Sequence, residues 1–250
     1  MGTGERLLVG FHAVTARLRH QPASVREIFV DAKRRDPRMR ELTALAEARG
    51  LRVVAVDDAR LAGLAGDARH QGVVARIEAG TQPADLDELL QGLAQSAFLL
   101  LLDGVTDPHN LGACLRVADA MGVHAVVVPK DRSAGLSPVV IKVASGATES
   151  VPLIAVTNLA RAIEELKDAG IRVLGAAEAG SHSLLDVRLD GPVAWALGAE
   201  GAGLRRLTRE RCDALVRIPM FGQVESLNVS VAAALCLYET RRQREAADRS

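Results

Sequence analysis

The sequence predicts an α/β protein whose main domain is a parallel sheet covered by helices. Short, almost continuously apolar segments recur along the 250-residue chain, and segments with helical spacing separate several of them. Aromatic residues make up 2% of the chain, so we expect a core of Ala, Val, Leu and Ile. Strands with this near-continuous hydrophobicity are buried on both faces, which is typical of parallel sheets.

Six apolar segments in the second half of the chain are predicted strands. They are residues 98–102, 124–128, 151–156, 171–174, 193–197 and 214–218. Apolar residues at helical spacing predict helices over 111–121, 158–169 and 229–244. The alternation of strands and helices assigns residues 96–250 to one α/β domain.

The first 78 residues are expected to form a smaller α/β domain. Residues 26–31, 51–56 and 73–77 are predicted strands, and residues 37–49 have helical spacing. This segment has 14 Lys and Arg against 10 Asp and Glu, whereas the whole chain has a formal net charge of zero. So small an excess agrees with RNA binding and equally with ordinary variation of a protein surface.

Residues 79–95 are expected to link the two domains, because they begin with Gly, Thr, Gln and Pro and continue into a short acidic stretch.

No apolar run approaches the roughly 18 residues of a membrane span. The N-terminus lacks the apolar core of a secretory signal. The three cysteines are too widely spaced for a disulfide framework or a zinc site. We therefore expect a cytoplasmic protein.

Three segments follow predicted strands, at the positions where open parallel sheets bind ligands. The first, residues 103–122, contains Asn110 and Arg116. We expect Asn110 to cap the following helix, where an amide and a guanidinium can hold a ribose hydroxyl and a phosphate. Taken alone, a capped helix with a surface arginine is the simpler interpretation.

The second segment, residues 197–204, has three glycines around Glu200. It matches neither G-x-G-x-x-G nor the P-loop, so a tight turn between a strand and a helix is its simpler interpretation. A carboxylate there would repel a pyrophosphate but suits a cationic sulfonium or a hydroxyl donor. The third segment, residues 218–231, places Ser226, Asn228 and Ser230 before or at the start of the last helix, where capping alone would explain them.

Together the three segments resemble the three signature motifs of the SpoU, or TrmH, family of RNA ribose methyltransferases. The resemblance covers about residues 96–245 and rests on Asp103-Gly104, Asn110-Leu111-Gly112, Arg116, Leu197-Gly198-Ala199-Glu200-Gly201, Ile218-Pro219-Met220 and Ser226-Leu227-Asn228-Val229-Ser230. Upstream, His70-Gln71-Gly72-Val73 resembles the end of a small domain, similar to ribosomal protein L30, in one subgroup. That subgroup includes the bacterial enzymes that methylate a guanosine ribose in 23S ribosomal RNA.

The resemblance implies a deep trefoil knot at the carboxyl end of the sheet and a homodimer. It also implies S-adenosylmethionine as cofactor, bound in the knot, and 23S ribosomal RNA as partner, free or in an assembling large subunit. The implied cofactor contacts are Gly198, Ile218 and Leu227. The implied catalytic residues are Asn110, Arg116, Glu200, Ser226 and Asn228.

The implied chemistry is an in-line displacement at a methyl group, without a metal. The resemblance implies that Arg116 activates the ribose hydroxyl. Because a guanidinium hardly loses its proton in a protein, we expect Arg116 to bind the substrate phosphate and stabilise the developing alkoxide. His109, next to Asn110, is interpreted as a loop residue without a catalytic role.

Three alternatives remain open on the sequence. One is a tRNA enzyme of the same family, against which the additional N-terminal domain argues. Another is an RNA-binding protein that has lost catalysis, against which the complete set of motif residues argues. The third is a nucleotide-dependent oxidoreductase, which lacks support because G-x-G-x-x-G is missing.

Overall fold

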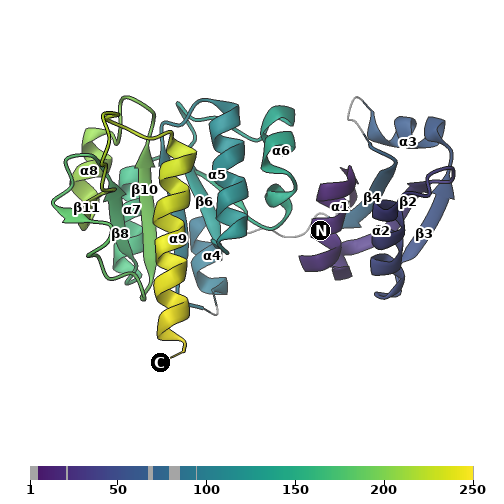
Figure 1. The fold of residues 1–250 in the computed structure, drawn as a ribbon, viewed down its shortest axis with the longest axis horizontal. Coiled ribbons are helices and arrows are strands. Elements are labelled where there is room, and N and C mark those ends of the chain that lie inside the picture. Colours follow the sequence, from purple (N-terminus) through teal and green to yellow (C-terminus); the bar gives the residue numbers. More distant parts are fainter. Residues whose placement is uncertain (1–4, 21, 67–69, 79–84, 94, 250) are drawn as a thin grey trace. The chain divides into compact units, whose positions relative to one another are not determined.

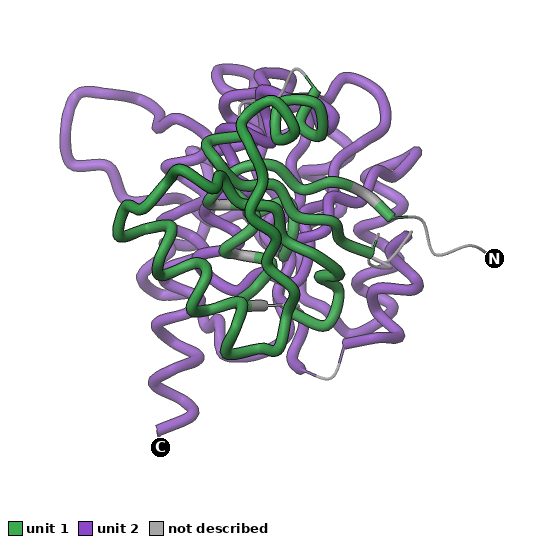
Figure 2. Tube along the Cα trace, turned by 90° about the vertical axis from the view of Figure 1, so that its right-hand side faces the viewer, with its two compact units in different colours: residues 1–82, 145–150 green, residues 83–144, 151–250 purple. Residues whose placement is uncertain are grey.

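A computed structural model describes residues 5–20, 22–66, 70–78, 85–93 and 95–249. The chain divides into two compact units, coloured separately in Figure 2. Unit 1 comprises Met1–Gln82 and Ser145–Ser150, and unit 2 comprises Pro83–Ala144 and Val151–Ser250. The expected linker, residues 79–95, is therefore divided between the units, and residues 79–84 and 94 lie outside the described part.

Unit 1 is built on a four-stranded sheet in the order β1-β4-β2-β3. Its strands are β1 (Glu5–Val9), β2 (Val25–Asp31), β3 (Arg52–Val56) and β4 (Val73–Glu78). Its helices are α1 (Phe11–His20), α2 (Pro37–Glu47) and α3 (Asp58–Ala65), with a short 3-10 turn, η1 (Pro22–Ser24). Residues of α1 and α2 share one core with the sheet, and Leu61 of α3 packs in a second core.

The three strands and the helix predicted for this region are confirmed, whereas β1, α1 and α3 were not predicted. Met39, Leu42 and Ala46 form the buried face of α2, as their spacing predicts. Helix α3 is short and its described residues bury one large side chain, Leu61, so it lacks a periodic signal. The 3-10 turn η2 (Ala147–Glu149) also belongs to unit 1, where the Glu149 carboxylate accepts a hydrogen bond from buried Arg17 at 2.8 Å.

Unit 2 is built on a seven-stranded parallel sheet in the order β7-β6-β5-β10-β8-β11-β9. Its strands are β5 (Phe98–Asp103), β6 (Ala125–Pro129), β7 (Leu153–Val156), β8 (Arg172–Ala176), β9 (His182–Ser183), β10 (Val193–Gly198) and β11 (Ala214–Arg217). Every residue of β5 and of β6 is buried. The prediction of a parallel sheet covered on both faces is confirmed.

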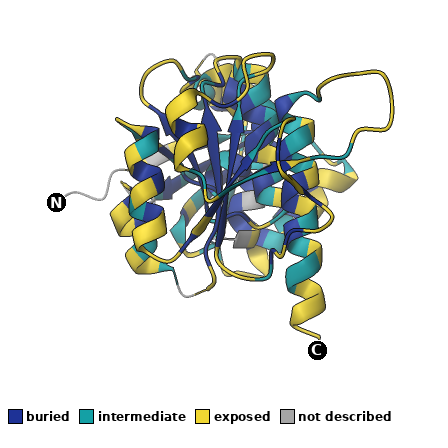
Figure 3. Ribbon diagram, turned by 90° about the vertical axis from the view of Figure 1, so that its left-hand side faces the viewer, coloured by how far each residue is buried: buried dark blue, intermediate teal, exposed yellow. Residues whose placement is uncertain are grey.

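Helices cover both faces of this sheet (Figures 1 and 3). They are α4 (Leu86–Gly92), α5 (Pro108–Ala120), α6 (Pro138–Ala144), α7 (Leu159–Asp168), α8 (Arg206–Arg211) and α9 (Val229–Ala247). α4 and α7 pack on one face through a shared core with Leu99 and Leu101. On the other face α9 contacts β10 and α5, and α5 contacts α6. All parallel strands end at one edge, so their following loops gather there.

The C-terminal half of helix α9 is fixed to unit 2 by polar contacts. The Trp195 indole of β10 donates a hydrogen bond to the Thr240 hydroxyl at 2.9 Å, and both side chains are buried. Near the end of the helix, the Arg244 guanidinium donates to the carbonyls of Ala97 and Gly191 at 2.7 Å each. Arg241 donates to the Met121 carbonyl. The bonds of Arg241 and Arg244 tie α9 to loops at the amino ends of the strands.

The loop from β8 to β9, residues 177–181, crosses the end of β11, which lies between the two strands in the sheet. A Cβ on Gly180 would lie 2.6 Å from the Arg217 amide nitrogen, so the crossing requires glycine. The Ala177 amide donates to the Val216 carbonyl at 2.9 Å, and the Arg217 guanidinium donates to the Gly180 carbonyl at 3.1 Å. The crossing loop is therefore held tightly against the strand beneath it.

His124, which precedes β6, is expected to make the fold sensitive to acid. Its Nδ1 accepts a hydrogen bond from the Phe98 amide at 3.1 Å. Burial, and then Arg244 and Arg241, lower the pKa of His124 below its ordinary value. The unfolded chain therefore binds a proton at higher pH than the folded one, and the free energy of unfolding should fall as the pH drops below about 6.5.

Denaturant unfolding at a series of pH values measures this effect. His124→Asn keeps an acceptor without a titrating group, so its unfolding free energy should depend less on pH. His182→Asn, at an exposed position, is the matched control and should retain the wild-type slope. Equal slopes in all three proteins would contradict the role assigned to His124.

Within the described residues, no helix combines the length and hydrophobicity that crossing a membrane requires.

Candidate active site

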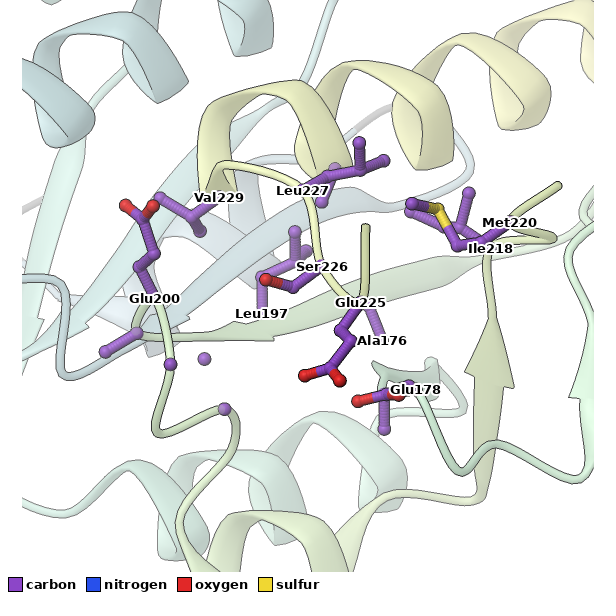
Figure 4. A pocket seen from close by; sticks show the side chains of 16 residues that line it. Ala176, Glu178, Leu197, Glu200, Ile218, Met220, Glu225, Ser226, Leu227 and Val229 are labelled. Carbon is purple, nitrogen blue, oxygen red and sulfur yellow. The ribbon is translucent and has the colours of Figure 1, made fainter. Parts of the chain in front are cut away.

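A cavity of about 310 Å³ opens where β8, β10 and β11 end (Figure 4). It is lined by residues 176–178, 197–201, 203, 218, 220, 225–227, 229 and 232. These residues come from the loops after three neighbouring strands and from the first turn of α9. The second and third segments singled out in the sequence therefore meet at one site.

The titratable side chains that line the cavity, among the described residues, are all carboxylates. Figure 4 shows Glu200 on one side of the cavity and Glu178 and Glu225 on the other. Leu197, Ile218, Leu227 and Val229 add apolar surface. Such a cavity favours a ligand that combines an apolar part with positive charge, and it disfavours a pyrophosphate, because the carboxylates would repel it.

The glycine-rich loop after β10 folds back on itself. Ala199 and Gly203 form an antiparallel bridge, and the Gly203 amide donates to the Ala199 carbonyl at 2.8 Å. A Cβ on Gly198 would lie 1.9 Å from the carbonyl carbon of Gly203. Position 198 therefore requires glycine because of the chain's own backbone, and the tight turn expected for this segment is present.

Asp103 joins this loop to the end of β5. Its carboxylate is buried and accepts a hydrogen bond from the Arg205 amide at 2.9 Å, and the Arg205 guanidinium lies 3.1 Å from it. The Asp103 carbonyl also accepts from the Ala199 amide at 3.1 Å. Asp103 thus holds the first and second segments together from inside the fold.

Asn110 and Asn228, far apart in the sequence, are hydrogen-bonded to each other. The Asn228 Nδ2 donates to the Asn110 Oδ1 at 2.9 Å. Asn228 is the N-cap of α9, and its Oδ1 accepts from the amide and hydroxyl of Ser230. The Asn228 side chain therefore both caps α9 and joins it to α5.

The expectation that Asn110 caps α5 is wrong. Asp107 is the N-cap, and its carboxylate accepts a hydrogen bond from the His109 amide at 2.9 Å. Pro108 occupies the first helical position, which leaves Asn110 in the first turn and its amide free to meet Asn228. Gly112 also lies inside this helix, where a Cβ would be 2.7 Å from Cβ of Val143 in α6.

Arg116 lies outside the cavity. It is exposed on α5, six residues after Asn110, or about 9 Å along the helix axis. Within the described part of the chain it makes no hydrogen bond, ion pair or cation–π contact. The guanidinium is therefore available to a large external ligand and is not needed to maintain the cavity.

The structure brings most of the expected site residues together. Five of the eight line the cavity, namely Gly198, Glu200, Ile218, Ser226 and Leu227. Asn110 and Asn228 join α5 to the start of α9, next to the cavity residues Leu227 and Val229. Sequence reasoning missed Glu178 and Glu225, and it did not foresee the buried link between Asp103 and Arg205.

Comparison with known proteins decides the family of this site. The family model described as SpoU rRNA Methylase matches residues 97–238, more than half of the chain. The chain belongs to the SpoU rRNA methylase family. A second model, described as RNA 2′-O ribose methyltransferase substrate binding, matches residues 7–83. The family resemblance expected from the sequence is confirmed, and the SpoU match covers every segment that lines the cavity.

Curated relatives of this SpoU protein match nearly its whole length. A 23S rRNA (guanosine-2′-O-)-methyltransferase, RlmB, of Ralstonia nicotianae is 59% identical over 96% of both chains. The protein of the same name from Yersinia pestis is 50% identical over 95% of this chain and 97% of its own. The similarity therefore includes both units.

Solved SpoU structures are similar to this chain in fold. The methyltransferase AviRb of Streptomyces viridochromogenes, in complex with AdoMet, is 29% identical, with a TM-score of 0.71 over 97% of this chain and 92% of its own. The TrmH/SpoU tRNA modifying enzyme of A. aeolicus, 27% identical with a TM-score of 0.57, covers 64% of this chain and 81% of its own.

Proposed function

We propose that this protein transfers a methyl group from S-adenosylmethionine to the ribose 2′-hydroxyl of a guanosine in 23S ribosomal RNA. The observation that carries the proposal is the cavity that SpoU motif residues enclose with carboxylates and apolar side chains. Relatives named for this reaction support the substrate, and they are similar over both units. A ribosomal RNA substrate places the activity in the cytoplasm.

The cavity suits S-adenosylmethionine better than a phosphate-bearing cofactor. Leu197, Ile218 and Leu227 would contact the adenine and ribose, and Glu178 or Glu225 would face positive charge on the methionine part. Gly198 lets the backbone of the loop line the cavity. When bound, this cofactor supplies an electrophilic methyl group attached to a sulfonium.

The residues around the cavity would position and polarise the ribose. Asn110 and Asn228 hold the first turns of α5 and α9 together, which fixes the wall that the ribose approaches. Ser226 and Glu200 line the opening and offer hydrogen-bonding groups to a hydroxyl. Arg116 would bind the RNA phosphate and stabilise charge that develops on the 2′-oxygen. Orientation of this kind supplies several kcal/mol, on the order of 7–11 in favourable cases.

We also infer a trefoil knot in unit 2. The 177–181 loop crosses β11, and the chain that leaves β11 continues through residues 218–228 to α9. The close contacts of Gly180 and Arg217 support threading of this segment beneath the crossing loop. The knot would explain why backbone from three loops converges on one cavity.

Methyl transfer by the purified protein tests the proposed function. Unmodified 23S ribosomal RNA transcribed in vitro is incubated with labelled S-adenosylmethionine, and the RNA is digested to nucleosides. We expect 2′-O-methylguanosine as the labelled product, and no product with tRNA transcripts. Label in a base, or in tRNA alone, would contradict the proposal. The match of the A. aeolicus tRNA modifying enzyme to 64% of the chain agrees with the preference for ribosomal RNA.

The exposed side of α9 supports a homodimer. Val231, Leu235 and Tyr238 have exposed fractions of 47%, 41% and 60%, although they recur at helical spacing. We propose that a second copy covers this stripe.

Leu235→Asp should therefore shift the protein from dimer to monomer in sedimentation, because a buried unpaired carboxylate is costly in an interface. Leu185→Asp, at a position with 68% exposure outside α9, is the control and should leave the dimer intact. A wild-type monomer would contradict the proposal.

The two units are proposed to divide the work, with RNA affinity and selectivity in residues 1–78 and chemistry in residues 96–250. A chain that begins at Pro83 keeps α4, whose Leu86 and Leu89 belong to the core of unit 2. It should bind S-adenosylhomocysteine like the full chain but methylate ribosomal RNA poorly. Calorimetry and the methylation assay measure the two effects. Unchanged RNA affinity and site choice would contradict the proposed role of unit 1.

A further inference from the structure

The loop after β6 carries two cations at the edge of the sheet where the cavity opens. Lys130 and Arg132 are both exposed, as is Asp131 between them. β6 is the neighbour of β5, and β5 is the neighbour of β10, whose end lines the cavity. Adjacent strands are about 4.8 Å apart, so the ends of β6 and β10 are separated by roughly 10 Å across the edge.

Arg132 and Arg116 differ from the other arginines of unit 2. Twelve of its fourteen described arginines bind a carboxylate or a carbonyl oxygen. They are Arg161, Arg172, Arg188, Arg205, Arg206, Arg209, Arg211, Arg217, Arg241, Arg242, Arg244 and Arg249. Among the described residues, none makes a hydrogen bond, ion pair or cation–π contact with the side chain of Arg116, Arg132 or Lys130. Arg132 lies in a loop at the edge of the sheet where the strands end. Arg116 lies on α5, a helix that begins at the same edge.

The loop that holds Arg132 is fixed in an unusual conformation. Arg132 has a φ of 57°, in the left-handed region that disfavours side chains with a Cβ. The Lys130 amide donates to the Val156 carbonyl at 2.8 Å. On the other side, the Ala134 amide donates to the Val105 carbonyl at 2.8 Å, and the Ser133 hydroxyl donates to the same carbonyl at 3.4 Å.

Val105 belongs to the loop that leads from Asp103 to Asn110, so the cationic loop is attached directly to the loop of the first motif. Backbone strain that is maintained by surrounding contacts is a feature of functional sites. The anchored loop holds the Arg132 backbone in place while its guanidinium and the Lys130 ammonium remain exposed. Such an arrangement suits an external anion with a fixed position relative to Asn110.

We propose that Lys130 and Arg132 form a binding site for backbone phosphates of the RNA, on nucleotides that flank the methylated ribose. The proposal rests on the proposed function for the identity of the anion. Phosphates are the anions that RNA repeats along its backbone, and cations that contact them fix the register of the strand without reading its sequence. With Arg116 on α5, the two side chains would direct the RNA along the edge of the sheet toward the cavity.

The salt dependence of RNA binding tests this site separately from catalysis. Affinity of the full-length protein for an unmodified 23S ribosomal RNA transcript is measured over a series of salt concentrations. The logarithm of the association constant falls linearly with the logarithm of the salt concentration. Each lost phosphate contact should reduce the magnitude of this slope by about 0.7–0.9. We expect this reduction in Lys130→Ala and in Arg132→Ala, and about twice the reduction in the double variant, with unchanged affinity for S-adenosylhomocysteine.

Three variants separate charge from folding. Arg132→Gly removes the charge and relieves the left-handed backbone, so it should fold well and still lose the contact. Arg132→Lys keeps the charge and should retain most of the slope. Arg172→Ala removes the same charge at the amino end of β8, on the opposite edge, and should leave the slope at its wild-type value.

The outcomes also separate this site from the proposed function. A wild-type slope in the double variant would overturn the phosphate site, even if the protein methylates ribosomal RNA normally. Reduced slopes in a protein that transfers no methyl group to RNA would support the phosphate site and contradict the proposed function.

Discussion

Substitution of Gly198 by alanine is expected to weaken S-adenosylmethionine binding by about 10- to 100-fold. The Cβ itself would lie 1.9 Å from the Gly203 carbonyl carbon and 2.2 Å from the Leu204 amide nitrogen, so the turn must open. Overpacking of this kind costs about 1–3 kcal/mol, and each 1.4 kcal/mol is about tenfold in affinity. Valine at this position should have a larger effect. Calorimetric titration with S-adenosylhomocysteine measures the change.

Gly222→Ala is the matched control for this substitution. It also adds one methyl group to a loop after a strand at this end of the sheet, but a Cβ there meets no atom within 4 Å. Its affinity should equal that of the wild type. Thermal unfolding of both variants distinguishes a distorted loop from a lost fold. A Gly198→Ala protein that folds and binds the cofactor with wild-type affinity would contradict placement of the cofactor at this loop.

Replacement of Arg116 by alanine is expected to slow methyl transfer by about 10²–10³. Preorganised stabilisation of developing charge is commonly worth about 2.7–4 kcal/mol, which corresponds to this factor. Cofactor affinity and the free energy of unfolding should change little, because Arg116 is exposed, lies outside the cavity and binds no other described residue. Single-turnover methyl transfer at saturating cofactor and RNA measures the rate.

Arg116→Lys tests the geometry of this role. An ammonium keeps the charge but cannot present the planar fork of a guanidinium to a phosphate, so the lysine variant should recover little of the rate. Arg172→Ala, which removes an exposed arginine at the opposite edge, should leave the rate unchanged. A lysine variant with wild-type turnover would refute the geometric role. An alanine variant with wild-type turnover would refute any catalytic role at position 116.

The core strands of unit 2 could be predicted from the sequence because burial determines which positions of each strand are apolar. Strands such as β5 are apolar at nearly every position since both of their faces are covered. The elements that were not predicted lack such an apolar pattern. α8 has three arginines among its six residues, and Thr208 is its buried residue; β9 has two residues, so no periodicity can reveal it.

The candidate site could be predicted where local sequence determines it and not where topology does. The motif residues Gly198, Ile218 and Leu227 line the cavity, and their contact with a cofactor stays a prediction. Glu178 was not predicted as a site residue because it reaches the cavity through the loop that crosses β11. That crossing depends on the order of strands in the sheet, which the local sequence does not determine. Two polar residues could each have capped α5, and proline at the first helical position favours Asp107 over Asn110.

Mapping of 2′-O-methyl groups in 23S ribosomal RNA from a strain that lacks this protein tests its proposed function most directly. We predict the loss of one 2′-O-methylguanosine, restored by the wild-type gene and by Arg172→Ala but not by Arg116→Ala. An unchanged set of ribose methyl groups in the deletion strain, or the loss of a methyl group from a base or from tRNA instead, would contradict the assignment of this chain as a 23S ribosomal RNA ribose methyltransferase.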